Sequence, residues 1–177
     1  KNIPDAYETD LLVVGGGPAG SCAAVAAARM GVKTIIIDNG NCLGGMATKG
    51  LVGPFMTCYD RYGEQMIIKG IFGEIVDRLV EKNWAIHPEH VRWESPYTAW
   101  IKAGHDHVTP FDPEGLKVIL ETMCGEAGVK ILYHTNFVET IMNGNAAAGA
   151  VVLQKQGLRK IHARMVIDAT GDGDFAV

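Results

Sequence analysis

The residues best suited to chemistry in this sequence are three glycines in the pattern Gly15-x-Gly17-x-x-Gly20. Gly15 permits a tight exit from a strand, and Gly17 leaves no side chain where a diphosphate must approach the backbone. Gly20 allows a following helix to pack closely on that strand. The start of such a helix offers free N–H groups and the positive end of its dipole to an anion. The pattern therefore predicts a site for the diphosphate of a dinucleotide.

The surroundings of this motif decide between a nucleotide site and a glycine-rich turn that binds no ligand. An apolar strand precedes the glycines, an alanine-rich helix follows them, and Asp38 closes the next apolar strand. An acid about 20 residues after the motif is placed to accept hydrogen bonds from a ribose diol. The three features together favour the nucleotide site.

Two further segments carry residues that suit a ligand lying on the first loop. Adjacent glycines in residues 43–48 (LGGMAT) would let the backbone approach such a ligand, although for this segment taken alone a plain turn is the simpler interpretation. Residues 168–172 (DATGD) follow a predicted parallel strand, at the sheet edge where ligands bind in open α/β folds. A surface loop is the alternative for this second segment.

The elements that must position these residues indicate an α/β fold, with a Rossmann-like parallel sheet and crossover helices. Buried parallel strands are predicted at 10–14, 34–37 and 129–133, and helices at 18–30, 68–82 and 112–127. Asn143-Gly144 and Gln156-Gly157 then punctuate alternating segments, which predicts a three-stranded antiparallel β-meander at 137–142, 147–155 and 158–163. A final buried strand is expected at 165–169.

Composition and charge exclude several classes of protein. The net charge of −4 gives no basic field for nucleic acid, and no apolar run reaches the roughly 18 residues of a membrane helix. The four cysteines form no CxxC pair, which favours neither a disulfide scaffold nor a zinc ribbon. We expect a cytoplasmic protein without nucleic-acid or membrane partners.

The remaining reactive side chains give weaker signals. His87-x-x-His90 and His105-x-His107 could supply metal ligands or an acid–base group, but polar loop histidines are the simpler interpretation. Cys42 and Cys58 are interpreted as small loop or core residues rather than redox thiols. We therefore predict no metal site, and spacing alone assigns no catalytic residue.

Taken in order, the motifs DLLVVGGGPAG, TIIID, LGGMATKGLVGPF, FDPEGLK, EAGVKILYHT and MVIDATGDGDFA resemble the FAD-dependent oxidoreductases with the glutathione-reductase-type FAD-binding fold. The likeness is to the branch that carries LGGMAT and DATGDGD, and it covers about 10–60 and 110–176. Residues 61–109 match less distinctively.

The resemblance implies a set of FAD contacts. Those to the pyrophosphate fall on Gly15, Gly17, Pro18, Ala19 and Gly20. Those to the adenosine ribose fall on Asp38, where most relatives carry Glu, with Asn39 beside it. Those to the pyrophosphate, ribityl or flavin fall on Gly44, Gly45, Met46, Ala47 and Thr48. Val138 would contact adenine through its backbone, and Ala169, Thr170 and Gly171 would pack on the middle of the cofactor.

The resemblance also implies an organisation and a function. Residues 1–60 and 110–177 would form the FAD-binding domain, with 61–109 as a helical and irregular excursion that begins a substrate domain. Such enzymes continue past DATGDGD, so we expect the FAD-binding domain to be incomplete here, completed by a C-terminal portion or a partner subunit. The expected function is hydride transfer between a small-molecule substrate and flavin N5. The alternatives are an NAD(P)-binding dehydrogenase domain and a non-catalytic flavin-binding or electron-transfer subunit.

Overall fold

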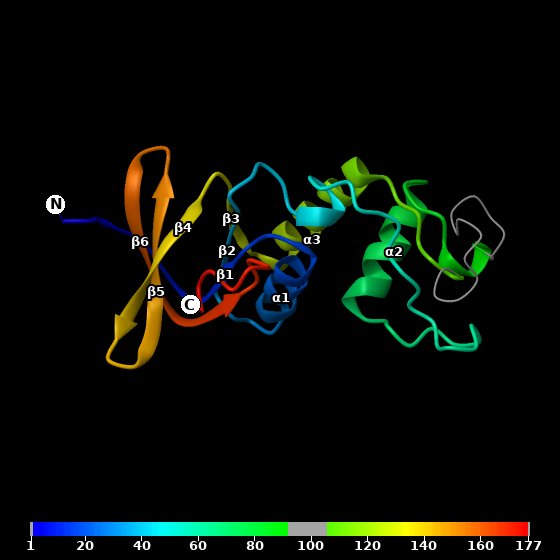
Figure 1. Cartoon of the computed structure of the whole chain (residues 1–177), viewed down its shortest axis with the longest axis horizontal. Helices are drawn as coiled ribbons and strands as arrows, with labels where there is room; N and C mark the ends of the chain where they lie inside the picture. Colours follow the sequence, from blue (N-terminus) through cyan, green and yellow to red (C-terminus); the bar gives the residue numbers. More distant parts are fainter. Residues whose placement is uncertain (1, 92–105, 177) are drawn as a thin grey trace. The chain divides into compact units, whose positions relative to one another are not determined.

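The computed structural model describes residues 2–91 and 106–176, which form two compact units (Figure 1). The first unit comprises residues 1–46 and 121–177, and the second comprises residues 47–120. The predicted division into a FAD-binding domain at 1–60 and 110–177 and the start of a substrate domain at 61–109 stays a prediction.

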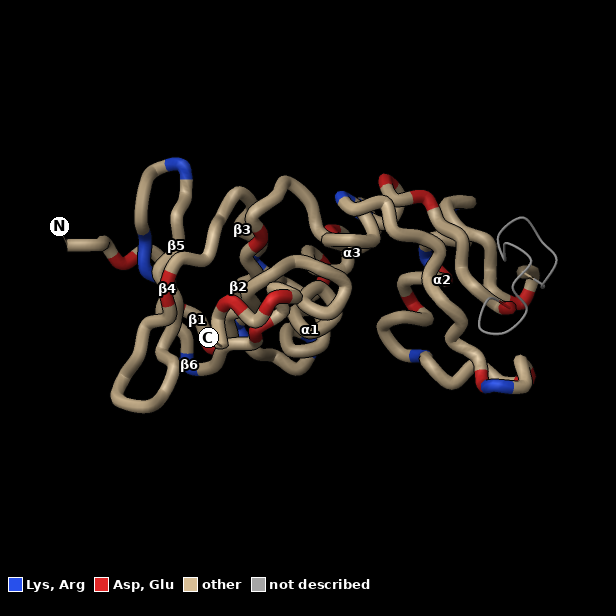
Figure 2. Tube along the Cα trace, viewed as in Figure 1, with Lys and Arg blue, Asp and Glu red and all other residues tan. Residues whose placement is uncertain are grey.

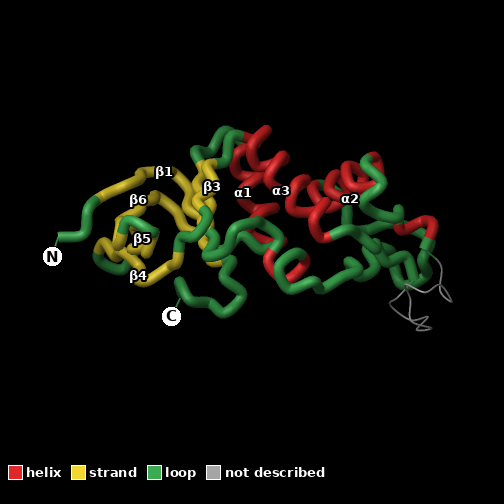
Figure 3. The backbone as a smooth tube through the Cα atoms, turned by 90° about the horizontal axis from the view of Figure 1, so that it is seen from above, coloured by secondary structure: helices red, strands yellow, loops and turns green. Residues whose placement is uncertain are grey.

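The first unit is built on one six-stranded sheet in the order β3-β2-β1-β6-β5-β4. Its strands are β1 (Asp5–Val14), β2 (Thr34–Ile37), β3 (Lys130–Leu132), β4 (Asn136–Asn143), β5 (Ala146–Gln154) and β6 (Gly157–Asp168). Strands β3, β2, β1 and β6 run parallel, whereas β6, β5 and β4 form an antiparallel meander. Figure 3 shows these strands as one twisted sheet, with helix α1 (Pro18–Arg29) beside it. The α/β fold with a parallel sheet and a meander is confirmed.

Continuous apolar runs build the centre of this sheet because both of its faces are covered. Leu12 and Val14 of β1 point to one face and join Ile35 and Ile37 of β2 in a buried core. Val13, on the opposite face, is also fully buried. A strand buried on both sides cannot alternate apolar and polar residues, which explains the sequence of β1 and β2.

The end of the chain differs from the expected arrangement in one respect. The third meander strand and the predicted final strand, 165–169, are one continuous strand, β6, whose first half pairs antiparallel with β5. Most of β6 pairs parallel with β1. The predicted burial is wrong for this stretch, because Met165 is 64% exposed and Val166 to Ala169 are only half-buried. One strand therefore joins the parallel and antiparallel parts of the sheet.

The second unit contains helix α2 (Ile71–Glu81) and a 3-10 helix, Pro88–His90. Helix α3 (Pro113–Ala127) begins in this unit and ends in the first. Three half-buried phenylalanines pack together in this unit: Phe55 stacks on Phe111 and meets Phe72 edge to face. Of the histidines considered in the sequence analysis, His105 lies outside the described part of the chain.

Charged residues of both signs are interspersed along the described chain, as Figure 2 shows. Within residues 2–91 and 106–176, no helix is long and apolar enough to cross a membrane.

A glycine inside the meander generates the first prediction. Gly149 of β5 has a φ of +141°, and a Cβ added there would overlap the carbonyl oxygen of Ile161 on the paired strand. Gly149→Ala should lower the free energy of unfolding by about 2–3 kcal/mol, because backbone strain and a backbone clash add. Chemical denaturation measures this change.

The matched control for Gly149→Ala is Gly125→Ala on the exposed side of α3, where an added Cβ meets nothing within 4 Å. That variant should be neutral or stabilising by up to about 1 kcal/mol, since alanine favours helix. Equal losses in both variants would contradict the account of the meander.

Candidate functional site

The candidate site lies where three loops leave neighbouring parallel strands at the same edge of the sheet. The last residue of β1, Val14, is in register with Ile37 of β2 and with Asp168 of β6. The loops that begin at residues 15, 38 and 169 therefore start side by side. The structure thus brings the predicted GxGxxG, Asp38 and DATGD segments together.

The first loop is packed backbone against backbone. Gly15 has a φ of +105°, and a Cβ there would overlap the carbonyl oxygen of Ala169. A Cβ on Gly20 would overlap the carbonyl oxygen of Gly15 and lie 3.1 Å from Ala169 Cβ. The packing of the loop therefore requires glycine at two of the three motif positions, whatever the loop binds.

Gly17 differs from its neighbours because a Cβ built on it meets no atom within 4 Å. Its φ of −64° and ψ of −178° suit any residue, so neither strain nor crowding requires glycine here. Gly45 approaches this position closely, because a Cβ on Gly45 would lie 3.0 Å from Gly17 Cα. Gly17 thus leaves open space beside the loop, as a position that receives a ligand would.

The start of helix α1 suits an anion. Gly17 is its N-cap residue and Pro18 follows, so no side chain caps the N–H groups of the first turn. Those groups carry the positive end of the helix dipole and favour a diphosphate. Ala19 is exposed beside them, whereas Gly20 is buried.

The second loop is tied to the first through Gly16, which the sequence pattern did not single out. The Gly16 carbonyl accepts a hydrogen bond from Gly44 N at 2.8 Å. A Cβ at Gly16 would lie 2.7 Å from Leu43 Cδ2 and 2.8 Å from Asp38 Oδ2. Gly16 stands between Gly15 and Gly17 in a GGG run, so the sequence alone did not show that position 16 also requires glycine.

Asp38 braces these two loops. Its Oδ2 accepts a hydrogen bond from Gly16 N at 2.9 Å, and its Oδ1 accepts one from Gly40 N at 2.7 Å. The residue is only 6% exposed. Contact with a ribose, implied by the resemblance, stays a prediction, but the structural role of this carboxylate is established.

The third loop is organised by Asp168, which begins the predicted DATGD segment but was assigned no contact of its own. Partial burial works to raise the pKa of Asp168, but hydrogen bonds from Thr170, Phe175 and Ala176 outweigh it and lower the pKa. The carboxylate is therefore ionised above acidic pH, and its stabilisation of the loop would be lost as the pH falls through that lowered pKa. An acid followed by Thr two residues later was the available sequence signal.

The other predicted contacts are dispersed. Asn39 and Met46 are exposed in the first unit, and Val138 is half exposed on β4. Ala47 and Thr48 are buried and belong to the second unit. Gly171, in the third loop, has a φ of +89°.

The cysteines are placed as small packing residues. All four are free; Cys42, Cys58 and Cys124 are buried, and Cys22 is half-buried. Burial raises the pKa of the thiols of Cys22 and Cys58, and it raises that of Cys124 to about 11. Because a protonated thiol is a poor nucleophile, these three cysteines are unsuited to thiolate chemistry.

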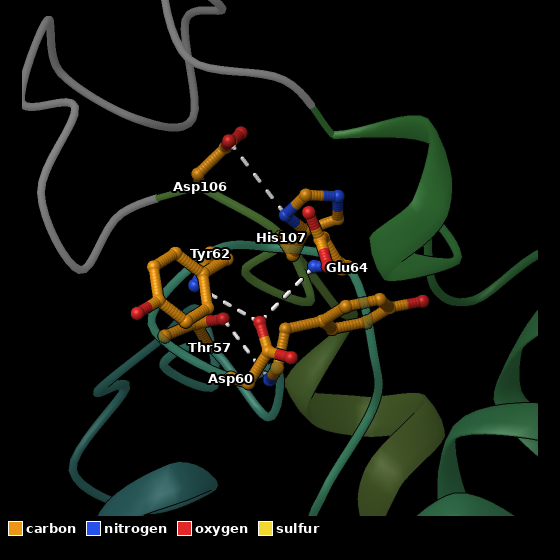
Figure 4. A network of polar contacts seen from close by, with 7 residues as sticks. Thr57, Asp60, Tyr62, Glu64, Asp106 and His107 are labelled. Atoms are coloured by element: carbon orange, nitrogen blue, oxygen red, sulfur yellow. Dashed lines mark hydrogen bonds and ion pairs between the residues drawn. The ribbon is translucent and has the colours of Figure 1, made fainter.

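One polar cluster in the second unit surrounds His107 (Figure 4). The buried His107 ring stacks on Tyr59 with centroids 4.3 Å apart, and its Nδ1 lies 3.7 Å from Asp106 Oδ2. A turn held by Asp60, which accepts from Tyr62 N and Glu64 N, lies nearby. Among the described residues, no three His, Cys, Asp or Glu side chains gather as a metal site would require.

Comparison with known proteins gives one family match. The family model for "FAD dependent oxidoreductase" matches residues 10–177. The chain is 28% identical to the digeranylgeranylglycerophospholipid reductase of Methanoculleus marisnigri and 29% identical to the thiamine thiazole synthase of Aeropyrum pernix. These matches cover 94% and 92% of this chain, but only 40% and 54% of the two relatives.

Solved structures show the same fold. A geranylgeranyl bacteriochlorophyll reductase-like protein from Thermoplasma acidophilum superposes with a TM-score of 0.64 at 22% identity, over 96% of this chain and 41% of that one. The glycerol-3-phosphate dehydrogenase of Bacillus halodurans, solved in complex with FAD, gives a TM-score of 0.59 at 17% identity. That match covers 92% of this chain and 34% of the dehydrogenase.

The different surroundings of the motif glycines generate the second prediction. Gly20→Ala should lower the free energy of unfolding by about 2–3 kcal/mol, because the new Cβ collides with backbone. Gly17→Ala should cost less than about 1 kcal/mol, the scale of a helix-cap effect. Thermal or denaturant unfolding without added cofactor compares the two. A larger loss for Gly17→Ala would show that the loop is packed differently.

Proposed function

Because the chain belongs to the FAD-dependent oxidoreductases, we propose that it binds FAD on these three loops and serves hydride transfer to or from a small-molecule substrate. When bound, FAD supplies the redox chemistry at its N5 atom, and the protein supplies binding, orientation and electrostatics. The observation that carries this proposal is the open position at Gly17, at the uncapped start of α1.

Each loop has a proposed part in holding the cofactor. The diphosphate lies against Gly17 and the first turn of α1, where backbone N–H groups neutralise its charge without a cationic side chain. Asp38 accepts from the adenosine ribose in addition to bracing Gly16. Gly45, adjacent to Gly17, lets the second loop approach the same diphosphate.

An NAD(P)-binding dehydrogenase domain, the first alternative, is not favoured because the family match covers residues 10–177 and is to FAD-dependent proteins. The second alternative is a non-catalytic flavin-binding or electron-transfer subunit, and the experiment below separates it from an enzyme. The chain spans only 40% and 54% of the two relatives named above. The proposal that it acts as an enzyme therefore concerns the protein to which these residues belong.

Anaerobic photoreduction of the full-length protein, followed by a substrate screen, separates the catalytic proposal from the non-catalytic one. The screen should include prenylated lipids, because one similar protein is named as a reductase of such a lipid. Oxidation of the reduced flavin by a screened compound supports an enzyme. A flavin that photoreduces and reoxidises but reacts with no compound favours the electron-transfer subunit.

The third prediction addresses the diphosphate. Gly17→Val should abolish FAD binding while the circular dichroism spectrum stays that of the parent, because the added Cβ meets no protein atom within 4 Å and the side chain occupies the open position. FAD retention after gel filtration, quantified by absorbance, measures this. Gly125→Ala is the matched control and should retain FAD fully. Stoichiometric flavin in Gly17→Val would refute the placement of the diphosphate.

The fourth prediction addresses Asp38. Asp38→Ala should weaken FAD binding by about 1–3 kcal/mol, the range for losing a hydrogen bond to a charged group. It should also lower the stability of the FAD-free protein, because the buried N–H of Gly16 loses its acceptor. Fluorescence titration and denaturation measure the two effects. Lost stability with an unchanged dissociation constant would leave Asp38 as a brace alone.

A further inference from the structure

The carboxylate of Asp168 is fully occupied by its own loop. Its Oδ1 accepts hydrogen bonds from the backbone N–H of Thr170 at 3.0 Å and from the Thr170 hydroxyl at 2.8 Å. Its Oδ2 accepts from the N–H groups of Phe175 and Ala176, each at 3.2 Å. A carboxylate has about four acceptor positions, so this one has none left for a ligand.

The Thr170 hydroxyl is saturated in the same way. It donates its single proton to Asp168, and it accepts from the N–H groups of Gly173 and Asp174 at 3.0 and 3.1 Å. One donor and two lone pairs complete the capacity of a hydroxyl. These two side chains therefore fix the path of residues 170–176 and cannot also hydrogen-bond a cofactor.

The loop of residues 170–176 contacts the first glycine loop through Ala169, which lies between Asp168 and Thr170 in the sequence. Ala169 N–H donates to the Val14 carbonyl at 2.8 Å, one residue before the glycines begin. Its carbonyl oxygen forbids a side chain at Gly15, and its Cβ lies 3.1 Å from the position of a Cβ on Gly20, where the carbonyl oxygen of Gly15 is the nearer obstacle. Any shift of Ala169 therefore moves atoms against which the loop of residues 15–20 is packed.

We propose that Asp168 and Thr170 are positioning residues, which set the glycine loop for the FAD diphosphate through Ala169 and do not touch the cofactor themselves. The inference rests on the proposed function, in which the diphosphate lies on residues 15–20. It changes the role implied for Thr170 by the resemblance, from a cofactor contact to a support of the neighbouring loop.

Isosteric substitutions in the full-length protein test the pair. Asp168→Asn places an NH2 group against backbone donors and should weaken FAD binding by about 10- to 100-fold. Thr170→Val removes the hydroxyl alone and should weaken it by about tenfold, whereas Thr170→Ser keeps the hydroxyl and should stay within about threefold of the parent. The double variant Asp168→Asn/Thr170→Val should lose less than the product of the single effects, because both belong to one network.

Ile161→Val is the control for a purely structural effect. It trims a fully buried residue of the sheet core and should lower the unfolding temperature without changing the FAD dissociation constant. Loss of affinity in Ile161→Val that matches the loss in Thr170→Val would overturn the proposal. So would parent-like affinity in both Asp168→Asn and Thr170→Val.

Amide hydrogen exchange in the absence of FAD separates this inference from the proposed function. Asp168→Asn should speed exchange at residues 15–20 as well as at 170–176, because the two loops share Ala169. If Asp168→Asn speeds exchange at residues 170–176 alone, the inference is overturned even if the protein binds FAD. A parent protein that takes up no FAD would overturn the proposed function, while faster exchange at 15–20 would still support the coupling of the loops.

Discussion

Close approach of backbone to backbone is the constraint on which the rest of this structure depends. Gly15, Gly20 and Ala169 lie so near one another that a side chain at either glycine would overlap a carbonyl oxygen. Parallel pairing of β1 with β6 makes this approach possible, because it starts both loops at the same level. The loops form a backbone surface, and of the three motif glycines 15, 17 and 20, Gly17 is the one with open space beside it.

Two acids, the buried Asp38 and the half-buried Asp168, hold this surface in shape rather than acting on a substrate directly. Asp38 joins the loop after β2 to Gly16, and Asp168 gathers the loop after β6 around its own carboxylate. Ionised acceptors make stronger hydrogen bonds to N–H groups than neutral ones do, which suits loops without regular secondary structure. Both carboxylates form hydrogen bonds within the protein, whereas the N–H groups in the first turn of α1 are available to bind an anion.

Local sequence patterns predicted the part of the fold that carries the glycine motif. The glycine motif, the alanine-rich helix and the apolar strand ending at Asp38 each carry a physical reason, and the structure places all three as expected. The continuity of β6 was not predictable. Charged residues at 159, 160 and 164 are typical of a solvent-facing hairpin strand, and this pattern predicts that the strand ends before Met165. The crowding at Gly16 and the saturation of Asp168 depend on loop paths, which residue spacing does not encode.

The most direct test of the central claim is a crystal structure of the full-length protein with FAD bound. We predict the diphosphate in van der Waals contact with Gly17 Cα and hydrogen-bonded to N–H groups of the first turn of α1, with residues 15–20 unmoved. A diphosphate bound elsewhere, or a protein side chain filling the space beside Gly17, would contradict the account.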